Sequence, residues 1–417
     1  MKKHFVLIST VLFISCAAVL TAQSESEPPA FGISLSGYIR TDLLYDSRQT
    51  VNLREGHFLL FAKAPAFDKD GRDANAAPSF HMLSIQTRLL GRITGPDALG
   101  ARTSGLIEGE FFGMADSDIN GFRLRHAYVK LNWPRTELMV GQFWHPMFVA
   151  ESFPEVVSFN TGAPFQPFNR SPQVRLTQLI GPLSFIATAA AQRDFVSNGP
   201  EGAGSVYARN AALPEFNLRA QYAAKFKSGS ELLLGLGGDL LALKPRLATA
   251  SGYATGVTLA SWAGMTYFKL RTSGLTFKAE AVYGGNLHHL IMLGGYAVRG
   301  VTDPERGTES YAPLNVVSAW GEIQTNGEAF QAGLFAGYSK NLGAGTAVTG
   351  TSFARGGNID TLLRIAPRVL VNSGKLRLAA EIEYTSASYG TPDLRGVVQN
   401  AKAAANLRVL GAVYYFF

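Results

Sequence analysis

The sequence predicts an all-β fold, a transmembrane antiparallel β-barrel of about sixteen strands with short turns at one end and long loops at the other. Three observations predict it. Apolar and polar residues alternate with a period of two in stretches of about ten residues. The links between these stretches alternate between short and long. After the first segment, no run of roughly 18 apolar residues offers a spanning helix.

The composition agrees with this fold. Charged residues make up 17% of the chain, below the roughly 25% typical of soluble domains, and the 44 glycines exceed the usual share of about 7%. Such a composition is expected when alternate residues face lipid and a wet interior.

The first residues have the features of a signal peptide, predicted at 1–22. Lys2 and Lys3 supply the positive start, an apolar stretch follows, and small residues precede a cleavage site before Gln23. We therefore expect export, with the mature chain beginning at Gln23.

The remainder divides into a short N-terminal segment, 23–31, and a single barrel, 32–417. The only cysteine, Cys16, lies in the leader, so the mature chain is expected to contain no thiol and no disulfide. An alternative is a lipoprotein acylated at Cys16, but the residues that follow it are apolar where a polar tether is usual.

Alternation defines each predicted strand. In the stretch that begins at Leu376, apolar residues such as Leu378 and Ile382 share one face, and Arg377 and Glu381 share the other. The predicted strands are 32–45, 80–94, 104–115, 122–133, 136–145, 172–180, 183–193, 214–226, 230–244, 255–271, 274–285, 315–325, 328–341, 358–371, 374–387 and 400–417.

The links carry turn residues where they are short, as in Gly181-Pro182 and Asn326-Gly327. The long links are 46–79, 146–171, 194–213, 286–314, 342–357 and 388–399. Two links break the alternation, a longer one at 95–103 and a short one at 116–121.

The sequence gives no sign of an enzyme or of a cofactor. We found no nucleophile elbow, zinc-protease motif, phosphate-binding loop or calcium loop. The pair His288-His289 has the residue type of a metal ligand, but neighbours in a strand point apart and carboxylates are missing nearby, so ordinary loop residues are favoured. Without Lys2 and Lys3 the formal charge of +7 becomes +5, and the basic residues are scattered, which argues against nucleic-acid binding.

The polar faces predict a hydrated interior, because so many charges are too costly to bury in a dry core. Their basic excess indicates a mild preference for anions. The alternative is that the charges only keep the interior wet. The charges expected inside are Arg88, Arg92, Glu108, Glu110, Lys130, Arg175, Arg219, Lys225, Lys269, Lys278, Glu280, Glu322, Arg364, Arg368, Arg377, Glu381, Glu383 and Arg408.

Two segments resemble Gram-negative outer-membrane porins. The last strand alternates apolar residues up to the aromatic Phe417, and the hairpin at 122–144 contains Arg125-His126-Ala127-Tyr128-Val129 followed by Gly141-Gln142-Phe143. The resemblance implies an outer-membrane channel for passive diffusion of small polar or ionic solutes, with short periplasmic turns and long extracellular loops. It also implies a homotrimer in outer-membrane lipid, inserted by the barrel-assembly machinery through Phe417.

The resemblance further implies that the inserted loop 146–171, the third external loop, folds into the barrel and narrows it. Glu151, Glu155, Asn160 and Arg170 are then the constriction candidates. The alternative is a rigid lid packed on the rim.

The parity of the strand at 122–133 places Arg123 and Arg125 on the lipid-facing side near the outer rim, where they would meet lipopolysaccharide phosphates. Three rival functions remain open: a substrate-specific channel, a barrel enzyme, and a secreted all-β binding protein.

Overall fold

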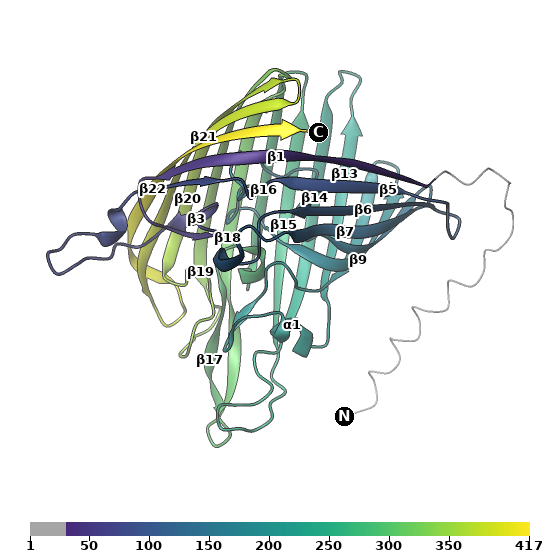
Figure 1. Ribbon diagram of the computed structural model, residues 1–417. Helices are drawn as coiled ribbons and strands as arrows, with labels where there is room; N and C mark the ends of the chain where they lie inside the picture. Colours follow the sequence, from purple (N-terminus) through teal and green to yellow (C-terminus); the bar gives the residue numbers. More distant parts are fainter. Residues whose placement is uncertain (1–30) are drawn as a thin grey trace.

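The computed structural model describes residues 31–417. The predicted signal peptide, Cys16 and most of the predicted segment 23–31 lie outside the described residues. The described chain forms a closed barrel of antiparallel strands (Figure 1).

One sheet of 18 strands makes the wall. In this sheet β4 and β5 are two halves of one wall strand, because both pair with β1, and β17 pairs only with the outer end of β18. Sixteen wall strands remain. They are β1 (Gly32–Asp46), β4 (Ser79–Leu83) with β5 (Arg88–Thr94), β6 (Arg102–Glu110), β7 (Arg123–Asn132), β8 (Thr136–Trp144), β9 (Arg170–Ile180), β10 (Leu183–Ala190), β13 (Glu215–Lys225), β14 (Glu231–Leu243), β15 (Leu259–Arg271), β16 (Leu275–Gly285), β18 (Thr308–Thr325), β19 (Phe330–Gly343), β20 (Ile359–Ser373), β21 (Leu376–Pro392) and β22 (Val398–Phe416).

The first and last strands close the barrel. Thr41 of β1 lies opposite Val413 of β22, and Ser36 of β1 lies opposite Leu90 of β5. Closure leaves none of the sixteen wall strands with an exposed edge, which is the condition for a sheet to lie in lipid.

The links alternate in length all the way around the chain, and both apparent exceptions obey the rule. The link 95–101 falls at the end with the short turns, and the link 111–122 falls at the end with the long loops. The predicted fold class is confirmed. The loop predicted at 388–399 is shorter, because β21 and β22 extend to Pro392 and from Val398.

Several elements were not predicted. Residues 84–87 interrupt the strand predicted at 80–94. The loop after β1, here L1 (47–78), contains the hairpin β2 (Thr50–Leu53) and β3 (Phe58–Ala62). The loop after β16, here L6 (286–307), contains η3 (His288–Leu290) and β17 (Gly295–Asp303), whose hairpin with β18 extends beyond the rim in Figure 1. The other short elements are η1 (Ala74–Ala76), η2 (Asp116–Asp118), β11 (Asn198–Gly199), β12 (Gly202–Ala203) and α1 (Val206–Asn210).

The two faces of the wall have opposite character, as predicted. Ile382, Val409 and Val413 point outward and are 46%, 46% and 41% exposed, whereas Glu381 and Glu383 point inward and are 1% exposed. An apolar outer band around a charged interior is the arrangement of a transmembrane barrel.

Among residues 31–417, no helix is long and apolar enough to cross a membrane.

Part of the interior is filled by loops. L1, L6 and the loop after β8, here L3 (145–169), contribute Phe58, Phe148, Phe165, Phe168 and Leu290 to one buried apolar cluster. Wall residues of β15, β16 and β18 to β21 also belong to this cluster, so these loops pack within the barrel and not only over its rim.

Candidate channel interior

Two carboxylates on the inner face of β21 hold loop L3. Glu381 accepts hydrogen bonds from the backbone N–H groups of Val157, at 2.6 Å, and Ser158, at 3.1 Å. Glu383 accepts one from the Asn160 amide at 2.9 Å. Because bonds to charged groups are among the stronger hydrogen bonds in proteins, these contacts fix the middle of L3 against β21.

A second set of charges holds L3 to the neighbouring strands. The backbone N–H of Glu155 donates to Glu322 of β18 at 2.8 Å, and the Glu155 carboxylate pairs with Lys278 of β16 at 2.7 Å. Arg368 of β20 pairs with the same Glu322 at 3.0 Å. Since L3 begins at β8 and ends at β9, these contacts show that it crosses the interior.

Two arginines attach loop L1 in the same way. Arg408 of β22 pairs with Asp46 and donates to the carbonyl of Gly56, both at 2.7 Å. Arg364 of β20 donates to the carbonyl of Leu60 in L1, at 2.8 Å, and to that of Ala163 in L3, at 2.7 Å. Arg364 therefore ties the two loops together.

Aromatic contacts fill the space between the loops. Phe112 and Phe159 stack with their ring centroids 3.9 Å apart, and Trp144 and Phe148 do the same. Such packing excludes water, which strengthens the neighbouring ion pairs.

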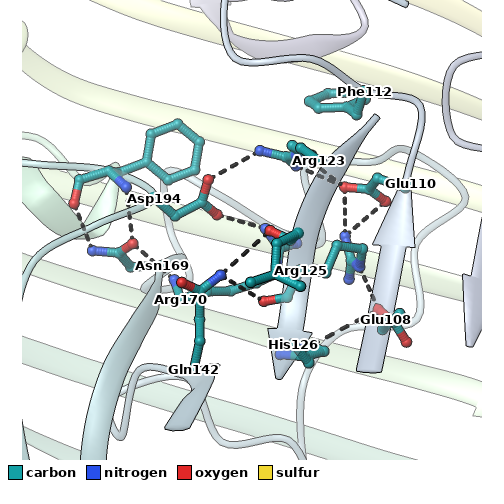
Figure 2. Close-up of polar contacts among 12 residues, drawn as sticks. Glu108, Glu110, Phe112, Arg123, Arg125, His126, Gln142, Asn169, Arg170 and Asp194 are labelled. Atoms are coloured by element: carbon teal, nitrogen blue, oxygen red, sulfur yellow. Dashed lines mark hydrogen bonds and ion pairs between the residues drawn. The ribbon is translucent and has the colours of Figure 1, made fainter. Parts of the chain in front are cut away.

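One carboxylate of β6, Glu110, lies close to three guanidinium groups, of which Figure 2 shows those of Arg123 and Arg125. Glu110 is 2.7 Å from Arg123, 2.8 Å from Arg125 and 2.9 Å from Arg88, and Arg125 also bonds to Glu108. Next to this group, Asp194 lies 3.0 Å from Arg123 and 2.6 Å from Arg170.

The predicted outward position of Arg123 and Arg125 is therefore wrong. Both side chains lie inside the barrel, 5% and 3% exposed. A bulge causes the difference: Glu108 pairs with His126 but Gly109 pairs with Leu124, so Arg125 is an extra residue in β7. An extra residue reverses the parity of the strand beyond it, which turns Arg123 inward.

Burial lowers the pKa of one histidine in L1, His57. His57 lies 3.3 Å from Gln86 and 3.6 Å from Asp42, between the rings of Phe112 and Phe159. Burial lowers the pKa of His57 to about 4, although Asp42 acts in the opposite direction. The ring is neutral at physiological pH.

A cavity of about 460 Å³ lies between L3 and the inner wall of β7 to β13. It is bordered by Lys130, Glu137, Glu151, Arg175 and Arg219. Arg219 has one carboxylate at ion-pair distance, Glu151 at 3.8 Å, and this carboxylate is half exposed. Arg175 and Arg219 are largely buried, 8% and 4% exposed, but neither has the close ion pair of the arginines beneath L1.

The structure divides the predicted site residues into two groups. The first group is buried and anchors the loops or joins the pairs of Figure 2; it contains Glu108, Glu110, Asn160, Arg170, Arg364, Arg368, Glu381, Glu383 and Arg408. The second group borders open space or is at least partly exposed; it contains Arg88, Arg92, Glu151, Glu155, Arg175, Arg219 and Arg377.

Sequence reasoning missed some interior charges. Arg40, Asp42 and Asp46 belong to the inward face of β1, and the parity of that strand was sufficient to find them. Asp194 lies in a loop, and no local pattern signals its contact with Arg170.

The geometry defines a class of protein: a closed sixteen-stranded barrel with an apolar outside, a charged inside and an internal third loop. No protein-family model matches the chain, and no curated protein matches its sequence.

Solved structures do match. The outer membrane channel DcaP of Acinetobacter baumannii has 17% sequence identity, and the match covers 95% of this chain and 100% of that chain with a TM-score of 0.69. The anion-selective porin from Comamonas acidovorans has 11% identity, 93% and 100% coverage and a TM-score of 0.54. The outer membrane protein OmpT of Vibrio cholerae has 10% identity, 94% and 100% coverage and a TM-score of 0.52. At these identities the likeness establishes the fold, which is that of outer-membrane porins.

Proposed function

We propose that this protein is a porin of the Gram-negative outer membrane, a water-filled channel for passive diffusion of small polar or ionic solutes. One observation carries the proposal: loop L3 is attached across a charged interior by Glu381, Glu383 and Glu322, while the outside of the barrel is apolar. A solute that enters is then selected by size at L3 and by charge at the wall.

The channel has a mild preference for anions. Beside the cavity under L3, the positive groups of Lys130, Arg175 and Arg219 face the carboxylates of Glu137 and Glu151. Lys130 and Glu137 pair with each other at 2.9 Å, which leaves Arg175 and Arg219 against Glu151 and thus an excess of one positive charge. Of the constriction candidates, Glu151 and Glu155 are the ones partly open to water, about half exposed, and they set the opposing negative field.

The protein works as a homotrimer in outer-membrane lipid and lipopolysaccharide, and the barrel-assembly machinery inserts it through the strand that ends at Phe417. A trimer form of the fold neighbour OmpT supports the assembly state.

The test is a recording of single channels in planar bilayers. We expect stepwise openings, and a reversal potential in a KCl gradient that favours chloride. The double variant R175Q/R219Q should shift the reversal potential toward potassium, because it removes the excess positive charge from the cavity.

The control is R299Q/R306Q, which removes two positive charges from the exposed hairpin of β17 and β18. A correctly folded barrel without openings contradicts the channel. Equal shifts in R299Q/R306Q and in R175Q/R219Q contradict the proposed origin of selectivity.

A substrate-specific channel is the second candidate, favoured by the charged cavity of definite size under L3. It differs from a general pore in one measurement: the flux of its solute saturates with concentration, whereas the flux through a general pore rises in proportion.

A further inference from the structure

Four side chains that could bind a metal meet in the interior, away from the ion pairs described above. His145 is the first residue of L3, Glu215 begins β13, Asp239 lies in β14, and His289 lies in η3 of L6. Each is at most 5% exposed. One potential ligand atom from each residue lies within 4.8 Å of those of the other three.

This group differs in its counter-charge from the buried carboxylates that hold the loops or belong to the pairs of Figure 2. Glu110, Glu322 and Asp46 each pair with arginine or lysine. Within the described residues, Glu215 and Asp239 have no arginine or lysine nitrogen within 4.0 Å, and the ion-pair partners of Glu215 are the rings of His145 and His289. Two adjacent buried carboxylates repel each other unless a proton or a cation lies between them.

Buried atoms that lack a hydrogen-bond partner also lie within this group. In the described part of the chain, Glu215 Oε2 and His145 Nε2 are buried and make no hydrogen bond. Asp239 accepts one from Asn217 at 3.1 Å. Buried polar atoms are rarely left unsatisfied, so their convergence is an independent sign that the group binds a ligand.

The two histidines of the group are not equally suited to bind a metal ion. His289 Nε2 faces the Glu215 carboxylate at 2.7 Å. His145 Nδ1 accepts the backbone N–H of Met147 at 3.2 Å, and a neutral ring with an acceptor at Nδ1 carries its proton on Nε2. His145 Nε2 lies 3.2 Å from Glu215 Oε1, a charge contact without hydrogen-bond geometry. His145 is therefore suited to orient Glu215 and is not suited to bind a cation.

We infer that His289, Glu215 and Asp239 form a binding site for a divalent transition-metal ion of the Zn²⁺ class, with His145 as a positioning residue for Glu215. A nitrogen and carboxylate set suits Zn²⁺, whereas Ca²⁺ and Mg²⁺ prefer oxygen ligands alone. Ligand atoms about 2.0–2.2 Å from Zn²⁺ lie roughly 3–3.5 Å from one another, and the atoms here are 2.7 Å apart for His289 and Glu215 and within 4.8 Å for every pair.

The ion would join segments far apart in the sequence. His289 belongs to L6, and Glu215 and Asp239 belong to the wall. His145, the first residue of L3, contacts Glu215 and so connects the start of this loop to the site. A bound ion would thus fasten L6 directly, and L3 indirectly, to the barrel wall. This site does not depend on the proposed transport function, because binding is measured without any flux.

The test uses the folded full barrel in detergent, freed of metal by a chelator and dialysed against Zn²⁺ or Co²⁺. We expect one ion per chain and a Co²⁺ absorption spectrum in the visible range. The variants D239N, E215Q and H289Q should weaken binding by more than about a hundredfold. H145F should weaken it by about tenfold and leave the Co²⁺ spectrum unchanged.

The matched control is H288Q. His288 is the neighbour of His289, but its ring lies 3.1 Å from the carbonyl of Val196, outside the group. We expect H288Q to bind as the unchanged protein does. Circular dichroism and heat-shifted gel mobility confirm that each variant is folded.

Three results would overturn the inference. They are the absence of stoichiometric binding by the unchanged barrel, undiminished binding in D239N and H289Q, and an equal loss in H288Q. A changed Co²⁺ spectrum in H145F would overturn the assignment of His145 as a positioning residue.

Discussion

Arg364 and Arg408 lie where loops L1 and L3 fill the barrel, whereas Arg175 and Arg219 lie beside the cavity under L3. The first two are 0% exposed and bond to carboxylates and to loop carbonyls. For the second two, the nearest carboxylate at ion-pair distance is Glu151, 3.8 Å from Arg219. Arginine thus anchors a loop in one region and, in the other, lines a cavity without a close carboxylate partner.

From this difference we infer that the anchoring arginines determine the stability of the barrel, whereas the arginines beside the cavity determine its ion selectivity. Removing an anchor leaves a partner buried without compensation, which changes stability and the position of a loop. Removing a positive charge that lines the cavity changes the field that a solute meets and leaves no buried carboxylate without its partner, because Glu151 is half exposed. The following predictions test that separation, from the largest expected effect to the smallest.

The largest effect is expected for E381A. It removes the acceptor for the N–H groups of Val157 and Ser158, and two hydrogen bonds to a charged group contribute about 3–6 kcal/mol. L3 should leave the wall, and single-channel conductance should increase several-fold with more noise. E328A, at an exposed turn residue, is the control. Unchanged conductance in E381A would mean that L3 does not limit the channel.

The next effect concerns the charges in Figure 2. E110Q leaves Arg88, Arg123 and Arg125 without their common carboxylate and should cost about 3–5 kcal/mol of stability. E137Q breaks the half-exposed pair with Lys130 and should cost at most about 1 kcal/mol. Thermal unfolding in detergent compares them. Equal losses would contradict the contrast between anchoring and accessible charges.

A smaller effect is expected on acidification. The pKa of His57 is lowered by burial to about 4, from an ordinary value of 6.5. Between these two values the unfolded chain binds a proton that the folded chain does not, so stability falls as the pH decreases through this window. At pH 5 the loss is about 2 kcal/mol.

H57F removes the titrating group and retains a ring of similar size. The difference in melting temperature between pH 7.5 and pH 5 should be smaller in H57F than in the unchanged protein. The same difference in both would show that His57 is not the titrating group.

The barrel could be predicted from the sequence because its signals are local. Alternation within a strand depends on which side meets lipid, and turn residues mark the short links, so β13 at Glu215–Lys225 was predicted within one residue at each end, as 214–226. The inward positions of Glu381 and Arg408 follow from the same parity.

The structure of the internal loops and the side-chain contacts inside the barrel could not be predicted in this way. The bulge at Arg125 depends on pairing with β6, and the sequence of β7 alone gives no sign of it. The strand β3, with the sequence Phe-Leu-Leu-Phe-Ala, is buried on both faces and lacks alternation. The meeting of His145, Glu215, Asp239 and His289 depends on residues up to 144 positions apart, His145 to His289.

The most direct test of the account is substituted-cysteine labelling during current recording, since Cys16 is the only cysteine in the sequence. E151C should react with a charged, water-soluble thiol reagent, and the current should fall as the label occupies the cavity under L3. V409C, on the apolar outside, should remain unlabelled in the bilayer. Labelling of V409C, or a labelled E151C with an unchanged current, would contradict a hydrated path beneath L3.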